Sequence, residues 1–157
     1  MALVDSDSRF LWSDIGAYGG NNDAFIFNGS QLCQAMDQNL CHIPRSTRLP
    51  NSNIRFPFYF IGDEIFALRF WLLKPYGGMN LTEEEQQCNY RLSVGRRVVE
   101  QAFGRLAMKF RILGTAPCIK PERYSKIIRS LLVIHNFLID TGAAEDNGVF
   151  FKYISVL

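Results

Sequence analysis

Two long helical patterns fill the second half of the chain, and they limit its fold more than any other feature. Thr82 is followed three residues later by Glu85, the spacing of a capping box that opens a helix. Apolar residues recur at helical spacing after it, namely Cys88, Leu92, Val99, Phe103, Leu106 and Phe110. Pro121 begins a second helix that Gly142 ends, with an inward face of Ile127, Ile128, Leu131, Ile134 and Leu138. Both helices need an apolar surface to cover.

The first half predicts the short strands that would supply this surface. Apolar runs at 2–5 and 9–19 are separated by alternating Asp and Ser, a turn composition, and the second run ends in a glycine-rich loop. Ser30 caps a short helix over 31–38, and three prolines mark 42–57 as a connecting loop. The run 58–63 predicts a buried strand, and 64–78 a short helix that stops near Pro75. Strands followed by long helices in 157 residues indicate one α/β or α+β domain.

Charge is concentrated in one part of the sequence. Residues 91–129 hold ten Lys or Arg and two Glu, a net charge of +8, whereas the whole chain carries only +2 and the remainder therefore −6. Such a segment can attract a polyanion, or it can be a solvated helix face that keeps the protein soluble. The sequence leaves these two interpretations open.

The sequence disfavours a secreted protein, a membrane-spanning protein and a zinc-binding protein. The first ten residues lack the basic start and apolar run of a signal peptide, and no uncharged stretch reaches the roughly 18 residues of a membrane span. The four cysteines show no paired spacing, which predicts free buried thiols in a reducing compartment. Cys41 and His42 are adjacent but have no second ligand pair, so a zinc site is not expected.

Three acidic residues are candidates for a metal site. Asp63 ends the predicted buried strand, Glu100 lies within the long helix, and Asp23 follows the glycine-rich loop. A simpler interpretation is available for two of them: Glu100 as the ion-pair partner of Arg96 one turn earlier, and Asp63 as a turn residue. Residue pattern alone favours the simpler interpretation.

Four blocks of sequence, in order, closely resemble the Harbinger/PIF-type transposases of the DDE endonuclease superfamily. The blocks are GAYGGNNDAFIFNGS, FIGDEIFALRFWLLKPYGG, NYRLSVGRRVVEQAFGRLAMKFRIL and LLVIHNFLID. The resemblance covers about residues 1–141 as one partial endonuclease domain, and residues 142–157 form a divergent tail. It implies an RNase H-like fold, in which helices flank a mixed sheet and acidic residues gather at the ends of strands.

The resemblance also implies a site and its chemistry. Asp63 matches the family's second catalytic Asp and Glu100 its catalytic Glu, while Asp23 matches a further recurrent acid that either completes the metal shell or braces its loop. Carboxylates suit Mg²⁺ or Mn²⁺, and two such ions about 3.5–4 Å apart would support in-line cleavage of a phosphodiester. DNA in the nucleus is the implied substrate. Cations beside the Glu are expected to hold its phosphates: Arg96, Arg97, Arg105, Lys109 and Arg111.

Two features of the match affect what the chain can do. His135 and Asn136 match a His-Asn pair on the family's last helix, and their apolar neighbours favour a packing role over a catalytic one. The resemblance implies that the family's first strand, which carries its first catalytic Asp, would stand before Ala2, and we expect this chain to lack both that strand and that Asp. Without that strand we expect unpaired edges inside the sheet unless a partner protein restores it. The leading hypothesis is thus an endonuclease domain of doubtful activity, and the alternative is a non-catalytic module that binds DNA or a protein.

Overall fold

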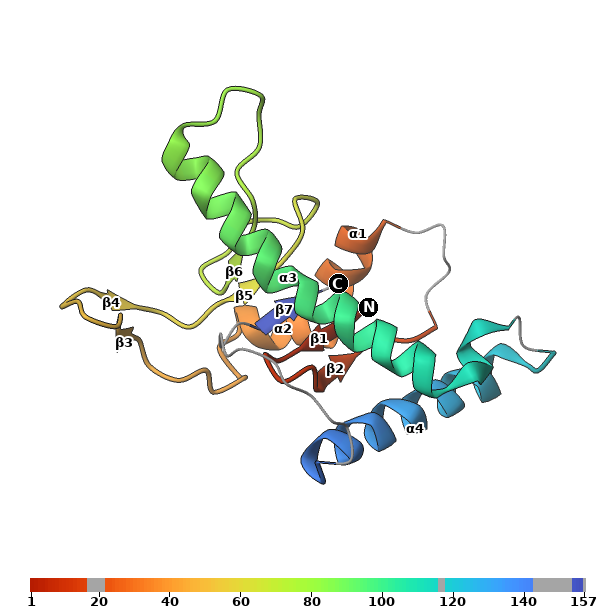
Figure 1. Cartoon of the computed structure of the whole chain (residues 1–157). Coiled ribbons are helices and arrows are strands. Elements are labelled where there is room, and N and C mark those ends of the chain that lie inside the picture. The colour runs from red at the N-terminus through yellow and green to blue at the C-terminus, as the bar shows by residue number, and fades with distance from the viewer. Residues whose placement is uncertain (17–21, 116–117, 143–153, 157) are drawn as a thin grey trace.

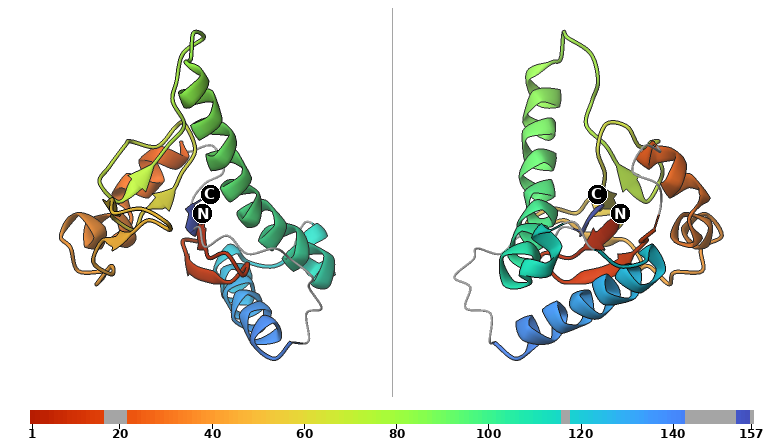
Figure 2. Two further views of the ribbon diagram at one scale, coloured as in Figure 1. Left: turned by 60° about the vertical axis from the view of Figure 1, so that its left-hand side comes forward. Right: turned by 90° about the vertical axis from the view of Figure 1, so that its right-hand side faces the viewer.

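The chain forms a five-stranded mixed sheet with helices on both faces (Figures 1 and 2). The computed structural model describes residues 1–16, 22–115, 118–142 and 154–156. The predicted glycines at 19 and 20 and most of the C-terminal tail lie outside these ranges. No helix in the described ranges is long and apolar enough to cross a membrane. The mixed α/β class predicted from the sequence is confirmed.

The sheet has the order β2-β1-β7-β5-β6. Its strands are β1 (Ala2–Val4), β2 (Phe10–Ser13), β5 (Phe60–Ile61), β6 (Leu72–Leu73) and β7 (Ile154–Val156). The central strand β7 comes from the C-terminal tail and lies antiparallel to β1 and parallel to β5. The expectation of unpaired edges inside the sheet is therefore wrong, because backbone groups of the chain's own last residues pair with both neighbours.

Apolar side chains on opposite faces of the sheet form two cores. Along β1, Leu3 points to one face and Ala2 and Val4 to the other, as the two-residue repeat of a strand requires. Leu3 packs with side chains of α1 (Asp23–Gly29), α2 (Gln31–Asp37) and β6. Ala2 and Val4 pack against α3 (Glu83–Lys109) and α4 (Pro121–Asp140). Figure 2 shows α3 on one side of the sheet and α1 and α2 on the other.

The helix ends predicted from capping residues are confirmed. Thr82 and Glu85 form both hydrogen bonds of the capping box, and Pro121 stands at the start of α4. The Ser30 hydroxyl accepts a hydrogen bond from the Cys33 amide at the start of α2. Gly142 follows α4 with a φ of +68°, which is a left-handed conformation that glycine adopts without strain. Helix α1 was not predicted, although Asn22 caps it and Asp23 stands in its first turn.

Residues 64–78 do not form the predicted helix. Turns occupy the first part, and Leu72 and Leu73 pair with Phe60 and Ile61 as the parallel strand β6. A short apolar run has no period that separates a buried strand from a helix, so the backbone partners on β5 decide. Gly62 permits the close turn, because a Cβ at this position would lie 3.0 Å from the Phe66 ring.

Three smaller expectations also need correction. Residues 42–57 include a two-stranded sheet of β3 (Thr47–Arg48) and β4 (Arg55–Phe56), because the prolines fall outside its strands. Ile134 is 44% exposed, and Leu132 and His135 form the buried centre of α4. All four cysteines are free, but only Cys33 is buried, where burial raises the pKa of its thiol. A short 3₁₀ helix, η1 (Arg111–Gly114), follows α3.

Candidate functional site

Asp63 lies two residues after the end of β5, and one of its carboxylate oxygens accepts two hydrogen bonds. Its Oδ1 accepts from the backbone amide of Glu64 at 2.7 Å and from Nη1 of Arg96 at 3.1 Å. The first bond fixes the turn that follows the strand, which agrees with the simpler interpretation of Asp63. The second bond joins the segment that follows β5 to α3. Asp63 is therefore a half-buried carboxylate whose charge is already balanced by a cation.

Arg96 approaches Asp63 from α3, and neither side chain is fully solvated. Their side chains are 20% and 33% exposed, so this ion pair is less screened than one at the open surface. The ion pair between Arg96 and Glu100 that the sequence suggests is wrong, because among the described residues Arg96 pairs with Asp63. Sequence offers no signal for this pairing, because the two residues are 33 positions apart on different elements.

Glu100 and Asp23 are both exposed. Glu100 lies four positions after Arg96, which places it one turn farther along the same side of α3. Asp23 stands in the first turn of α1, where a carboxylate favours the positive end of the helix dipole. Within the described ranges, no three or more His, Cys, Asp or Glu side chains form a group that could hold a metal ion. The structure thus leaves Asp23, Asp63 and Glu100 without the clustering that their predicted joint role requires.

The residues present do not fit a Mg²⁺ or Mn²⁺ centre in this arrangement. Such ions take several oxygen ligands within one small shell. Here Arg96 provides the positive charge beside Asp63, and the only acid one turn away on α3 is exposed to solvent. A guanidinium donates hydrogen bonds and has no atom that can bind a cation. A metal would have to displace Arg96 before Asp63 could serve as a ligand.

The five predicted phosphate-binding cations are spread around α3 and η1. Arg105 lies nine positions after Arg96, about half a turn around the helix axis, so the two occupy opposite flanks. Arg97, Lys109 and Arg111 are exposed, and Arg105 is half-buried. This part of α3 contacts α4, where burial lowers the pKa of His135 and the charges of Arg105 and Lys109 lower it further, against the hydrogen bond with Ser8. A binding surface on α3 and η1 would consist of the exposed members, because Arg96 is paired with Asp63.

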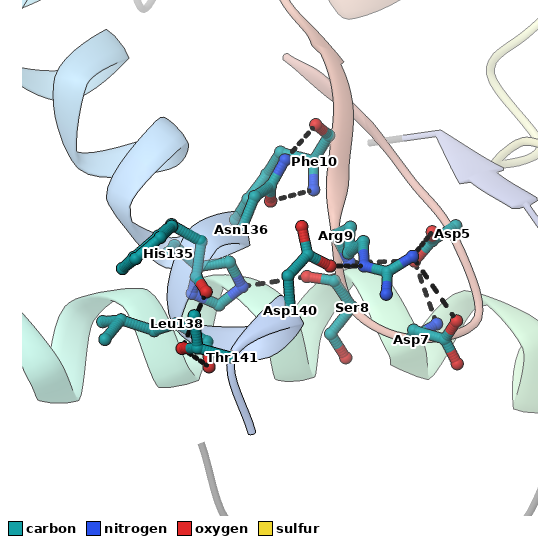
Figure 3. Close-up of polar contacts among 11 residues, drawn as sticks. Asp5, Asp7, Ser8, Arg9, Phe10, His135, Asn136, Leu138, Asp140 and Thr141 are labelled. Carbon is teal, nitrogen blue, oxygen red and sulfur yellow. Dashed lines mark hydrogen bonds and ion pairs between the residues drawn. The ribbon is translucent and has the colours of Figure 1, made fainter. Parts of the chain in front are cut away.

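His135 and Asn136 bind the backbone of the β1–β2 hairpin (Figure 3). Nε2 of His135 lies 2.9 Å from the carbonyl oxygen of Ser8, and its ring packs edge-on to Phe10 at 5.1 Å. The Asn136 amide bonds both the N–H and the C=O of Phe10, each at 2.9 Å. The packing role predicted for this pair is confirmed.

Acidic residues of the same hairpin surround Arg9. Its Nε lies 2.8 Å from a carboxylate oxygen of Asp140 at the end of α4, and its Nη1 lies 4.0 Å from oxygens of Asp5 and Asp7 (Figure 3). Asp5 also accepts hydrogen bonds from two backbone amides of its own turn. These acids therefore stabilise the hairpin and its contact with α4.

Comparison with known proteins decides the family. A family model described as DDE superfamily endonuclease matches residues 1–136, which include Asp23, Asp63, Glu100, His135 and Asn136. The chain belongs to this family. It is 30% identical over 144 residues to "Protein ALP1-like" of Arabidopsis thaliana, covering 88% of this chain and 34% of that protein. The resemblance to Harbinger-type transposase-derived nucleases is thus confirmed.

Animal members of the family match a shorter part of the chain. The human protein named "Putative nuclease HARBI1" is 32% identical over 89 residues, which is 54% of this chain and 25% of that protein. Its mouse counterpart is 34% identical over 87 residues. The chain spans about a third or less of the length of these relatives. No solved structure matches the chain.

Proposed function

We propose that this member of the DDE superfamily is a DNA-binding domain in which an ion pair prevents metal binding at the inherited nuclease site. One observation carries the proposal: the guanidinium of Arg96 binds Asp63, the carboxylate that matches the family's second catalytic Asp. Divalent ions bring several carboxylates together by balancing their charge, and an arginine balances only one. As arranged here, the chain would bind DNA without cleaving it.

Contact with DNA would come from the exposed cations of α3 and η1. Arg97, Lys109 and Arg111 belong to the segment of net charge +8, and a duplex gains affinity without sequence preference when Lys and Arg replace its counterions. The same family membership supports a nuclear location. An RNase H-like fold is supported by the mixed sheet with a central strand antiparallel to β1 and parallel to β5, and by helices on both faces.

Binding and cleavage can be measured on the same preparation. A labelled DNA duplex titrated with the purified chain should show binding that weakens steeply between about 50 and 200 mM salt. Supercoiled plasmid incubated with the chain and Mg²⁺ or Mn²⁺ should remain uncut. Absence of salt-sensitive binding, or plasmid nicking that Glu100→Gln abolishes, would contradict the proposal.

Metal-dependent endonuclease activity is the second candidate, and a specific observation favours it. Asp63 follows β5 with Gly62 between them, and Glu100 lies one turn beyond Arg96, which binds Asp63, on the same side of α3. Two changes would be needed to complete the centre: Asp63 must separate from Arg96, and a third carboxylate must join Asp63 and Glu100. Asp23, on α1, is the family-matched acid that we propose as its further member. Nicking that requires Asp63 and Glu100 together, and Mg²⁺ or Mn²⁺, would establish this activity.

A further inference from the structure

A two-stranded arm that carries only positive charge extends from the molecule. The arm, residues 45–56, contains β3 and β4, which form a separate antiparallel sheet. Figure 1 shows it projecting away from the five-stranded sheet and the helices that cover it. The family match does not assign it a role, and none of the proposed site residues belongs to it.

The charge of the arm is entirely positive. Residues 38–62 include Arg45, Arg48 and Arg55 and contain no Asp or Glu. All three arginines are exposed. The ion pairs found within the described ranges involve Arg9, Arg69 and Arg96, so no acid of those ranges balances the charge of the arm. The arm therefore presents three positive charges to solvent.

Two of these arginines stand directly opposite each other. Arg48 of β3 is paired in register with Arg55 of β4, so both side chains leave the same face of the ribbon. Like charges at this position of a sheet repel one another and destabilise it. Arg55 donates a hydrogen bond of 3.4 Å to the carbonyl oxygen of Ser46, which orients its guanidinium across the ribbon. A bound anion would convert this repulsion into attraction.

The turn of the arm fixes the register of the two arginines. The amide of Leu49 bonds the carbonyl of Ile54 at 2.9 Å, and the amide of Ile54 bonds the hydroxyl of Ser52 at 3.0 Å. At the base, the Phe56 ring packs edge-on against Tyr59 at 5.5 Å. These contacts hold Arg48 and Arg55 on one face, and Phe56 leaves the opposite face.

We propose that the arm binds the phosphate backbone of duplex DNA through Arg48 and Arg55, with Arg45 at its base. The major groove of B-DNA is wide enough to admit a two-stranded β-ribbon. Two adjacent guanidinium groups on the ribbon could then each donate hydrogen bonds to a phosphate of the DNA strands that flank the groove. The inference rests on the proposed DNA-binding function and adds a second contact, separate from α3. Because the contact is to phosphate, it contributes affinity and orientation without reading sequence.

The decisive experiment compares a double variant of the arm with a charge-matched control. Arg48→Gln with Arg55→Gln removes two positive charges from the arm, and Lys126→Gln with Arg129→Gln removes two from exposed positions of α4. In titrations of labelled duplex at several salt concentrations, the arm variant should bind more weakly. The slope of log affinity against log salt should fall by about two, since each lost phosphate contact removes roughly 0.9. The control should keep a slope close to that of the wild type.

Charge reversal separates binding from folding. Arg48→Glu places opposite charges across the ribbon, so the thermal midpoint without DNA should stay the same or rise, while DNA affinity falls further than in Arg48→Gln. An arm variant with the DNA affinity and salt slope of the wild type would overturn the inference, while DNA binding by α3 would stand. The arm would then be a candidate binding surface for an acidic protein. A wild-type chain that fails to bind duplex DNA would overturn the proposed function as well.

Discussion

The side-chain amide of Asn136 makes both hydrogen bonds that a further strand would make to Phe10. Its Oδ1 accepts from the Phe10 amide and its Nδ2 donates to the Phe10 carbonyl, each at 2.9 Å. Because β2 is an edge strand, these backbone groups have no strand beyond them. Asn136 of α4 therefore satisfies the backbone N–H and C=O of Phe10 at this edge of the sheet, and it fixes where the helix lies along the hairpin.

Removal of this amide should destabilise the whole domain. Asn136→Ala leaves the N–H and C=O of Phe10 without these partners, and we expect a loss of about 1–3 kcal/mol in the free energy of unfolding. Asn136→Asp should also destabilise, because a carboxylate would face the Phe10 carbonyl without a donor. Urea unfolding followed by circular dichroism measures both. Asn53→Ala, at an exposed position, should stay within about 0.5 kcal/mol of the wild type.

Stability should decrease at mildly acidic pH because of His135. Burial lowers the pKa of this imidazole from its ordinary 6.5, the nearby Arg105 and Lys109 lower it further, and the hydrogen bond with Ser8 opposes them. The unfolded chain then takes up the proton first, so stability present above about pH 6.5 is lost as pH falls through that value toward the lower pKa of the folded state.

Two histidine variants test this assignment. His135→Gln should flatten the dependence of the thermal midpoint on pH between about 5 and 7, although it also destabilises the domain at neutral pH. His42→Gln removes an exposed histidine and should leave the pH dependence of the wild type. An unchanged slope in His135→Gln would show that another group is responsible.

Release of Asp63 should create a measurable affinity for divalent ions. In Arg96→Met the carboxylate loses its cation, and Mn²⁺ should then raise the thermal midpoint more than it does in the wild type. At a hundredfold excess of Mn²⁺ over Kd, the free energy of unfolding should rise by up to about 2.7 kcal/mol. Adding Glu100→Gln should reduce this effect. Arg97→Met, at the exposed neighbouring position, should respond to Mn²⁺ as the wild type does. Equal Mn²⁺ shifts in all variants would mean that Arg96 does not compete for Asp63.

Interruption of β7 should destabilise the sheet at its centre. Ser155→Pro removes a backbone N–H from a strand that pairs with β1 on one side and β5 on the other. We expect a loss of at least about 2 kcal/mol, whereas Ser155→Ala keeps the N–H and should lose less than the proline variant. If the proline variant unfolded at the same urea concentration as the wild type, β7 could not be the central strand.

Several local features of this protein could be predicted from the sequence. The Thr82–Glu85 box, Ser30, Pro121 and Gly142 mark helix ends correctly, because a helix cap depends on residues within one turn of each other. The strand before Asp63 and the packing role of His135 and Asn136 were likewise predicted. The sequence predicts a helix where the structure has β6 at Leu72–Leu73, since the partner strand that decides this conformation lies outside the apolar run.

The tertiary structure decided how the candidate site and the sheet are completed. Arg96 and Asp63 are 33 positions apart, Asn136 and Phe10 are 126 apart, and β7 enters the sheet from the opposite end of the chain to β1. The residues themselves carry the family resemblance, the helix caps and the uneven charge. Which carboxylate meets which cation, and which strand fills the centre of the sheet, depend on backbone and side-chain groups that meet only when the two cores pack. Such contacts have no local sequence pattern, because burial of distant apolar surfaces brings their partners together.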